Sequence, residues 1–249
     1  MNKKSTFDKI ARDIKNIKIQ GARNIAKAAL RAYSLIPTRT SKSKLLSLRP
    51  TEPMLEHVLN LADKIPFSKI HSHFDSAQDE INKIVFKIIK NNDVIFTHCH
   101  STNVSYALIY AKKKGKKFQV YNTETRPLFQ GRKTAKELSH AGIKITMFID
   151  SALEDAMSGE MGKKVNKVFL GADALFKQGI INKIGSELVS IIARDKKIPV
   201  YIIADSWKFT KRKLPIEQRK LKEIWANAPR HIKIKNPAFE FVRKKYITK

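Results

Sequence analysis

Val94-Ile95-Phe96-Thr97-His98-Cys99-His100-Ser101 joins a short apolar run to a polar segment that contains the only cysteine of the chain. The apolar run is typical of a buried strand, and the residues after Ser101 have the apolar spacing of a helix. We therefore expect a strand followed directly by a helix, with Cys99 at the junction.

The same alternation continues through the second half of the sequence. Strands are expected at 94–96, 118–121, 145–149, 168–170 and 200–204, and helices at 104–114, 134–141, 152–157 and 185–194. Continuous apolar strands joined by crossovers of helix length indicate a parallel sheet with helices on both faces. The sequence thus predicts an α/β fold with a Rossmann-like sheet.

Before residue 90 the pattern is different, because apolar residues recur at spacings of three and four, which predicts helices. Pro37, Pro50 and Pro53 separate these helices, and we expect the polar stretch 38–44 to be a loop or bend. We therefore predict an N-terminal helical domain over residues 1–90 and a Rossmann-like α/β domain over residues 91–249.

Charge is the unusual feature of the composition, since 50 Lys and Arg against 22 Asp and Glu leave a formal net charge of +28. Polyanions are natural partners for such a chain. The basic residues are spread along the whole sequence without a helix-turn-helix, zinc-finger or RNP-like signature. A lysine-rich solvated surface, phosphorylated small molecules and weak contact with nucleic acid all stay open as explanations.

The 249 residues contain no apolar run long enough to span a membrane, and the first residues lead into an amphipathic segment. We therefore expect a soluble, cytoplasmic protein with no membrane partner.

Polar residues follow each expected strand, at 97–101, 123–127 with 130–132, 150–151, 171–173 and 205–208. Because the carboxyl ends of parallel strands meet at one edge of a sheet, we expect these residues to converge. A thiol, carboxylates and fixed cations at one edge provide an acid, a base and groups that hold an anion.

Cys99 has two interpretations, because a lone thiol cannot form a disulfide within the chain and is either a small buried residue or a reactive one. A place just before a helix, with His98 and His100 beside it, favours the thiolate. The two histidines also suggest a metal. No second cluster of ligands accompanies them, however, so we expect neither a metal nor a cofactor.

Several of the other polar residues also have ordinary structural interpretations. We expect Asp150 to cap the following helix, whereas Asp173 precedes no clear helix and is harder to explain in this way. Arg126 could be an exposed loop residue, Arg132 could begin a helix without touching a ligand, and Lys183 could lie solvated in a turn.

Seven ordered motifs resemble the large family that joins the isomerases of ribose 1,5-bisphosphate and methylthioribose 1-phosphate to regulatory subunits of the exchange factor for translation initiation factor two. The resemblance covers most of the chain. The motifs lie at 17–22, 48–51, 97–99, 123–132, 171–174, 182–185 and 236–239.

Cys99 and Asp173 distinguish the branches of this family. In the isomerases the cysteine and the aspartate of these motifs are the catalytic pair, and the translation subunits tend to lose the cysteine. Both residues are present here. The resemblance therefore implies an archaeal-type ribose 1,5-bisphosphate isomerase of nucleotide salvage, in which Asp173 donates a proton and Cys99, as thiolate, accepts one. It also implies a phosphorylated sugar as substrate and a homodimer or a higher homo-oligomer.

The resemblance further implies a set of residues that bind the substrate and its phosphates: Gln20, Gly21, Ala22, Arg23, Arg49, Ser101, Arg126, Gln130, Arg132, Asn182, Lys183 and Lys208. The isomerases usually carry Arg-Gly-Ala-Gly where this chain has Gln20-Gly21-Ala22-Arg23. This departure keeps a second hypothesis open, a non-catalytic regulatory subunit that binds a phosphorylated ligand or the initiation machinery.

Overall fold

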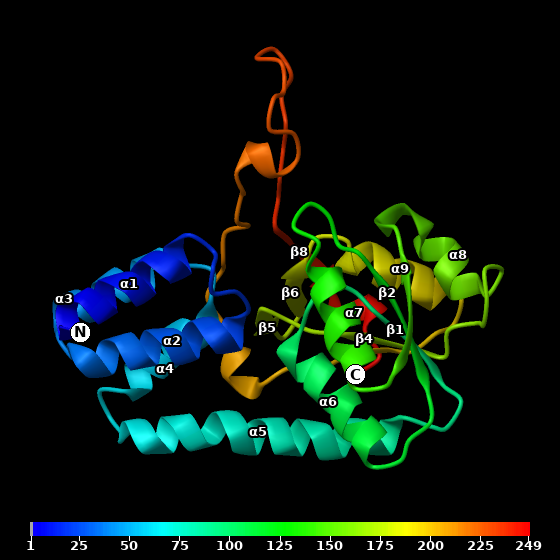
Figure 1. The fold of residues 1–249 in the computed structure, drawn as a ribbon, viewed down its shortest axis with the longest axis horizontal. Helices are drawn as coiled ribbons and strands as arrows, with labels where there is room; N and C mark the ends of the chain where they lie inside the picture. Colours follow the sequence, from blue (N-terminus) through cyan, green and yellow to red (C-terminus); the bar gives the residue numbers. More distant parts are fainter. Residues whose placement is uncertain (1) are drawn as a thin grey trace.

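The computed structural model describes residues 2–249, and its first part consists of helices (Figure 1). Each helix places its apolar residues on one face, at the spacing that the sequence shows. Two clusters of buried residues hold these helices together, one around Ile14, Ile25 and Leu59 and one around Leu30, Met54 and Phe74. The helices are α1 (Lys3–Lys15), α2 (Ala22–Leu35), α3 (Arg39–Leu48), α4 (Pro53–Leu61) and α5 (Phe67–Ile88).

The expected loop at 38–44 is wrong, because α3 begins at Arg39. Thr38 caps this helix, and its hydroxyl accepts a hydrogen bond from the backbone N–H of Ser41 at 3.2 Å. Arg39, Thr40, Ser43 and Lys44 are exposed on α3, while Ser41 and Leu45 are buried. A cap and a buried face of two residues accompany the helical conformation of this polar stretch.

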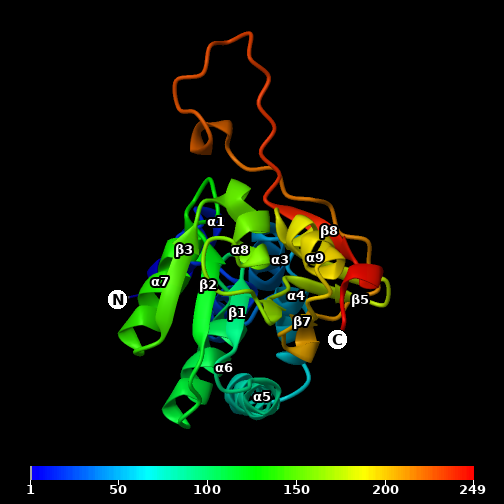
Figure 2. The same ribbon diagram turned by 90° about the vertical axis from the view of Figure 1, so that its right-hand side faces the viewer.

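The parallel sheet that the sequence predicts is present. Its strands run in the order β3-β2-β1-β4-β7. Figure 2 labels β3, β2, β1 and β7 in this order, and β4 pairs between β1 and β7. They are β1 (Val94–Thr97), β2 (Gln119–Thr123), β3 (Lys144–Phe148), β4 (Lys167–Leu170) and β7 (Val200–Ile202). The connecting helices are α6 (Thr102–Lys113), α7 (Gln130–His140), α8 (Leu153–Ser158) and α9 (Ser186–Asp195).

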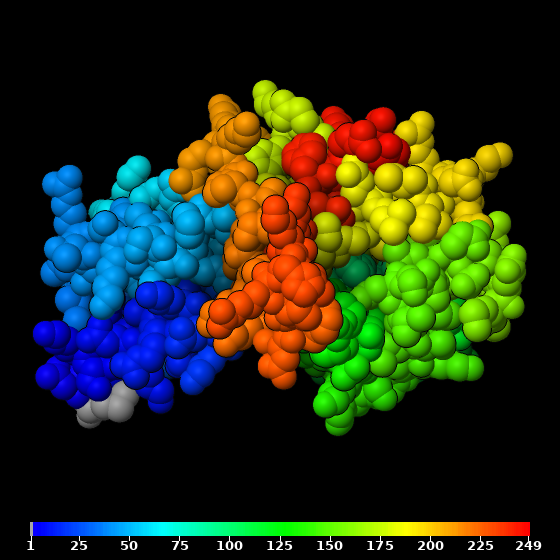
Figure 3. Space-filling view, turned by 90° about the horizontal axis from the view of Figure 1, so that it is seen from above, coloured from blue at the N-terminus to red at the C-terminus, as the bar shows by residue number. Residues whose placement is uncertain are grey.

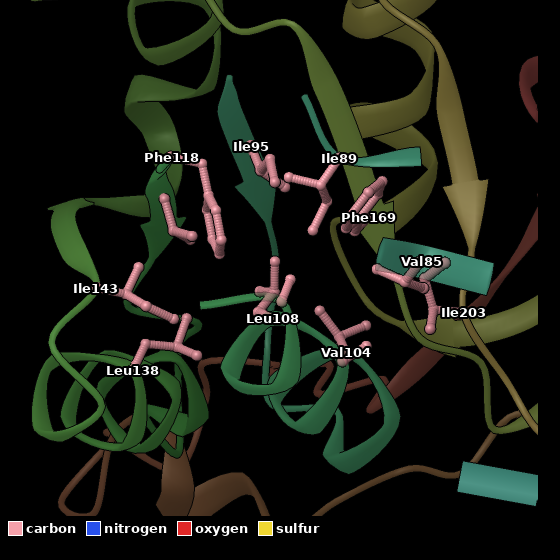
Figure 4. Packing of buried hydrophobic residues seen from close by; sticks show 13 residues of the cluster. Val85, Ile89, Ile95, Val104, Leu108, Phe118, Leu138, Ile143, Phe169 and Ile203 are labelled. Carbon is pink, nitrogen blue, oxygen red and sulfur yellow. The ribbon is translucent and has the colours of Figure 1, made fainter. Parts of the chain in front are cut away.

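Alternate residues of the strands enter cores on opposite faces of the sheet. On one face, Ile95 and Phe169 pack against side chains of α5, α6 and α7, among them Val104 and Leu108 (Figure 4). On the other face, residues such as Phe96 pack against α8 and α9. The alternation follows from the twofold periodicity of a strand, and it produces a sheet covered on both sides.

Helix α5 contributes to both halves of the molecule and runs beneath them in Figure 1. Ile70 and Phe74 belong to the core of the helical part, and Val85 belongs to the core under the sheet. Because one helix belongs to both cores, the cores do not separate at residue 90. The division into two domains at this residue stays a prediction.

A second, antiparallel sheet was not anticipated from the sequence. Its strands are β5 (Ala174–Phe176), β6 (Gly179–Lys183) and β8 (Phe239–Arg243), in the order β5-β6-β8. The turn considered for Lys183 is therefore wrong, because this residue pairs with Phe239 across β6 and β8. The pairing partner lies far away in the sequence, so no local pattern indicates it.

Between β7 and β8 the chain leaves the body of the molecule as an extended excursion, coloured orange to red in Figures 1 and 2. We call residues 220–235 the arm. Two backbone hydrogen bonds close its base, from the N–H of Arg219 to the carbonyl of Asn236 and from the N–H of Ala238 to the carbonyl of Glu217, both at 2.9 Å. Seen from above, the arm stands over the junction between the blue helices and the green α/β part (Figure 3).

Four short 3-10 helices complete the described residues: η1 (Asp150–Ala152), η2 (Ser206–Lys208), η3 (Leu221–Glu223) and η4 (Lys244–Tyr246). Across residues 2–249, none of the helices combines the length and the apolar character that a membrane crossing requires.

Candidate functional site

A cavity of about 570 Å³ lies where the ends of β1 and β4 meet the helical part and the base of the arm. Residues from the polar segments 97–101, 130–132, 171–173 and 205–208 converge there as the topology predicts, whereas 123–127 and 150–151 do not line the cavity. Eleven of the predicted site residues line it: Gln20, Gly21, Ala22, Arg23, Arg49, Cys99, Ser101, Gln130, Asp173, Asn182 and Lys208.

Cys99 lies directly after β1 in a left-handed backbone conformation, with φ of 66°. Its backbone N–H donates to the hydroxyl of Thr125 at 3.0 Å, and its carbonyl accepts from the hydroxyl of Thr134 at 2.9 Å. Burial raises the pKa of the thiol from its ordinary value of 9.0 to about 11, although the nearby Lys183 ammonium lowers it in part. At neutral pH and without ligand, Cys99 is therefore a thiol and not the expected thiolate.

The histidines beside Cys99 do not supply the positive charge that we expected from them. His98 lies between the hydroxyl of Thr123 at 2.6 Å and the carbonyl of Ile184 at 2.8 Å, and its burial lowers its pKa. Burial also lowers the pKa of His100 to about 4, with a further contribution from Lys133. Both rings are neutral at pH 7. Lys183 is therefore the cation that lowers the pKa of the thiol most.

Asp173 follows β4, the neighbour of β1 in the sheet, and also lines the cavity. Its backbone N–H donates to the carbonyl of Ile181 at 2.9 Å. Burial raises the pKa of its carboxyl, while Lys208 and Arg49 act in the opposite direction. The burial effect prevails, which favours a protonated carboxyl. The cavity thus contains a thiol and a carboxyl whose pKa lies above its ordinary value, two groups suited to proton transfer.

Lys208 is buried in η2, and its ammonium donates to the carbonyl of Ala172 at 2.6 Å. A longer contact of 3.5 Å joins it to the side-chain oxygen of Asn103. Asp205 caps η2 by accepting a hydrogen bond from the N–H of Trp207 at 2.9 Å. These contacts fix the position of the lysine beside Asp173.

The helical part contributes the segment at the start of α2. Gly21 has φ of 84°, a value that glycine adopts without strain. The side-chain amide of Gln20 donates to the carbonyl of Ile17 at 3.0 Å. Arg23 is only 8% exposed, and its guanidinium donates to Asp75 at 2.9 Å. A guanidinium is therefore present at the cavity wall, but it belongs to Arg23 and not to position 20, where this chain has a glutamine.

Three predicted residues do not line the cavity. Arg132 is half exposed and pairs with Glu124 at 2.9 Å, and its guanidinium lies 3.8 Å from the centre of the Phe129 ring. Arg126 is exposed and lies 5.0 Å from the same ring. Lys183 is buried behind Cys99 and acts on the thiol through its charge.

Asp150 is not the helix cap that the sequence suggests. Its two carboxylate oxygens accept hydrogen bonds from the backbone N–H groups of Thr125, at 2.9 Å, and Arg126, at 2.6 Å. The carboxylate therefore stabilises the loop after β2, which also holds the backbone of Cys99 through Thr125.

Glu52, Arg219 and Phe239 also line the cavity, although they are not among the site residues predicted from the sequence. A local signal existed for two of them, since Glu52 directly follows the motif at 48–51 and Phe239 ends the motif at 236–239. Arg219 carries no such signal, because only the return of the chain through the arm brings it to the site.

Comparison with known proteins places the chain in a family. A model of the Initiation factor 2 subunit family matches residues 18–249. The ribose 1,5-bisphosphate isomerase of Methanocaldococcus jannaschii is 32% identical over 98% of this chain and 87% of its own length. The methylthioribose-1-phosphate isomerase of Dehalococcoides mccartyi is 30% identical over 97% of this chain and 86% of its own length.

Solved structures show the same fold. The translation initiation factor eIF-2B of Pyrococcus horikoshii superimposes with a TM-score of 0.82 at 24% identity, over 97% of this chain and 92% of its own. A chain of the tetrameric eIF2B-beta2-delta2 complex of C. thermophilum superimposes with a TM-score of 0.80 at 18% identity, over 98% of this chain and 89% of its own. On these matches, the chain belongs to the Initiation factor 2 subunit family.

Proposed function

We propose that this protein is an aldose-ketose isomerase that converts ribose 1,5-bisphosphate to ribulose 1,5-bisphosphate. The observation that carries the proposal is the position of Cys99 and Asp173 in the lining of one cavity, together with the cations Arg49 and Lys208. Relatives named ribose 1,5-bisphosphate isomerase align with nearly the whole of this chain and with most of their own length, and they support the choice of substrate.

The reaction needs an acid for ring opening and a base for hydrogen transfer. The Asp173 carboxyl, whose protonated form is favoured by burial, donates its proton to the ring oxygen as the bond between that oxygen and C1 breaks. The Cys99 thiolate then removes the proton from C2, which gives an enol phosphate. Cys99 returns this proton to C1, and the Asp173 carboxylate takes the proton of the C2 hydroxyl, so both groups regain their starting forms.

Before the substrate reacts, the thiol of Cys99 must release its proton to water, so the thiolate is the form that begins and ends each turnover. The Lys183 ammonium is the group that lowers the pKa of the thiol most. We propose that Lys183 stabilises the thiolate from behind and does not touch the substrate, which agrees with its place outside the cavity lining.

The test uses the purified protein and NMR detection of the ketose product from ribose 1,5-bisphosphate, with methylthioribose 1-phosphate as a second substrate. Cys99→Ser and Asp173→Asn are each expected to lower kcat by about a hundredfold or more, the usual contribution of a general acid or base. Asp79→Asn, on the exposed face of α5, is the matched control. Absence of turnover with both substrates, or full activity of both variants, would contradict the proposal.

Gln20 favours a second candidate function, because its amide binds a backbone carbonyl at a position where the isomerases carry an arginine. A regulatory subunit without catalysis, which binds a phosphorylated ligand in the same cavity, fits this departure and the net charge of +28. It predicts a salt-sensitive complex with initiation factor two or tRNA that Cys99→Ser leaves intact. Absence of a complex at low salt would rule it out.

We also propose a homodimer or a higher homo-oligomer, because one of the solved structures with this fold is a tetrameric complex. Light scattering of the purified protein tests this directly. A mass of 28.5 kDa, that of one chain, would contradict it.

A further inference from the structure

Glu52 is a buried carboxyl in the cavity wall that the proposed reaction does not use. It precedes Pro53 at the start of α4, is 3% exposed, and does not cap that helix with its side chain. Its Oε1 lies 3.4 Å from the guanidinium of Arg49. Its Oε2 is buried and makes no hydrogen bond with any group in residues 2–249.

Unpaired polar atoms are concentrated around this cavity. In the described part of the chain, six buried side-chain atoms have no hydrogen-bond partner, and four belong to residues of the cavity lining. These four are Arg49 Nε, Glu52 Oε2, Gln130 Oε1 and Arg219 Nε. Buried polar groups are normally paired in native proteins, so a cluster of unpaired ones in a cavity wall indicates that a polar ligand completes them.

The groups around Glu52 determine which ligand fits. Arg49 at the end of α3 and Lys208 in η2 are cations, whereas Asp173 after β4 and Glu217 at the base of the arm are acids. Glu217 bridges two guanidinium groups, with contacts of 3.0 Å to Arg49 and 3.0 Å to Arg219. The wall therefore presents guanidinium groups that are held in place by a carboxylate, an arrangement that suits an anionic oxygen.

We propose that Glu52 is a specificity-determining residue, whose Oε2–H donates a hydrogen bond to a phosphoryl oxygen of the ligand beside the guanidinium of Arg49. The inference rests on the proposed function only in that the ligand carries a phosphate ester. A carboxylic acid is a donor to phosphate, whereas a carboxylate in the same place would repel it. Glu52 thus selects a phosphorylated end of the ligand over a plain hydroxymethyl group.

The protonation of Glu52 supports this role. Burial raises the pKa of its carboxyl to about 8. The negative charge of Asp173 in its ionised form and that of Glu217 raise this pKa too, while Arg49 and Lys208 lower it. The carboxyl is therefore mainly protonated at neutral pH. Above about pH 8 its ionisation makes binding of a phosphate ester weaker, by up to tenfold for each further pH unit.

The experiment is calorimetric titration of the full chain with ribose 5-phosphate, with inorganic phosphate and with unphosphorylated ribose, between about pH 6.5 and 9.5. Glu52→Gln keeps a donor but cannot ionise, so near pH 7 its Kd is expected within about threefold of the wild type, and the loss of affinity above pH 8 is absent. Glu52→Ala removes the donor and is expected to raise Kd near pH 7 by about tenfold. Glu80→Gln, exposed on α5 and paired with Lys83, is the control and is expected to behave as wild type.

Three results would overturn the inference. One is a loss of affinity above pH 8 that is equal in the wild type and in Glu52→Gln. Another is tighter binding of ribose 5-phosphate by Glu52→Ala near pH 7, which would mean that Glu52 is ionised and repels the ligand. Binding of inorganic phosphate alone, without ribose 5-phosphate, would also contradict it. Because Glu52→Gln is nearly isosteric, it keeps the test valid if Glu52→Ala fails to fold.

The outcomes separate this inference from the proposed function. Binding of ribose 5-phosphate that depends on Glu52, without turnover of any sugar phosphate, would leave the inference in place and remove the isomerase. Turnover of ribose 1,5-bisphosphate with equal kinetics in the wild type and both Glu52 variants would support the isomerase and remove the inference about Glu52.

Discussion

The reactivity of Cys99 tests the electrostatics of the site, because this residue is the only thiol in the chain. Burial raises its pKa from the ordinary value of 9.0 to about 11. The thiolate fraction near pH 8 therefore falls from about one in ten to about one in a thousand. Since only the thiolate reacts with iodoacetamide, the folded protein is expected to react about a hundredfold more slowly than the unfolded chain.

The assay is iodoacetamide labelling followed by intact-mass spectrometry, with the protein folded or unfolded in denaturant. For the folded protein, the rate is expected to rise about tenfold for each unit between about pH 7 and 10, without a plateau. Lys183→Met removes the ammonium that lowers the pKa of the thiol, so it is expected to slow labelling further. Lys177→Met, exposed in the turn before β6, is the matched control.

A plateau of the labelling rate below about pH 9.5 in the folded protein would refute this reasoning, because it would mean that the thiol ionises near its ordinary pKa. Faster labelling in Lys183→Met would refute the role given to that ammonium.

Three further predictions concern stability. A Cβ at Gly131 would lie 1.7 Å from a backbone carbonyl at the end of β2, so Gly131→Ala is expected to lower Tm by at least about 5 °C, while Ser139→Ala on the same helix leaves it unchanged. The pKa of His100 is about 4 in the folded protein and 6.5 in the unfolded chain. Neutral His100 is therefore compatible with full stability above pH 6.5, and the free energy of unfolding falls as the pH drops from 6.5 toward 4. Urea titrations are expected to show a smaller fall of this free energy in His100→Gln. Asp93→Ala leaves the buried Lys167 ammonium without the carboxylate at 2.6 Å, and the free energy of unfolding in urea is expected to fall by about 3–5 kcal/mol.

Each of these predictions has a contradicting outcome. Equal Tm values for Gly131→Ala and Ser139→Ala would mean that the backbone moves apart at no cost. An unchanged acid slope in His100→Gln would mean that other groups determine it. A loss below about 1 kcal/mol in Asp93→Ala would mean that water reaches Lys167.

The parallel sheet could be predicted because its strands are local and continuous apolar runs. Ile95 and Phe96 show why this works, since neighbouring residues enter the cores on opposite faces and both must be apolar. The antiparallel sheet could not be predicted in the same way. Lys183 pairs with Phe239 across 56 positions of chain, and neither segment shows alternation clear enough to indicate a strand.

The residues of the candidate site could be predicted where a motif and a strand end coincide, as for Cys99 and Asp173. Their protonation could not, because it follows from burial that only the folded chain creates. The same holds for His100, which the sequence suggests as a cation and which burial keeps neutral. Arg219 reaches the cavity only because the arm leaves and returns, a path that no local pattern shows.

The most direct test of the central claim is a crystal structure of the protein soaked with ribose 1,5-bisphosphate, or of an inactive Cys99→Ser variant with the same ligand. We expect electron density for the sugar phosphate between position 99 and the Asp173 carboxyl, with one phosphate beside Arg49. Density elsewhere on the molecule, or a ligand in the cavity that contacts neither residue, would contradict the account.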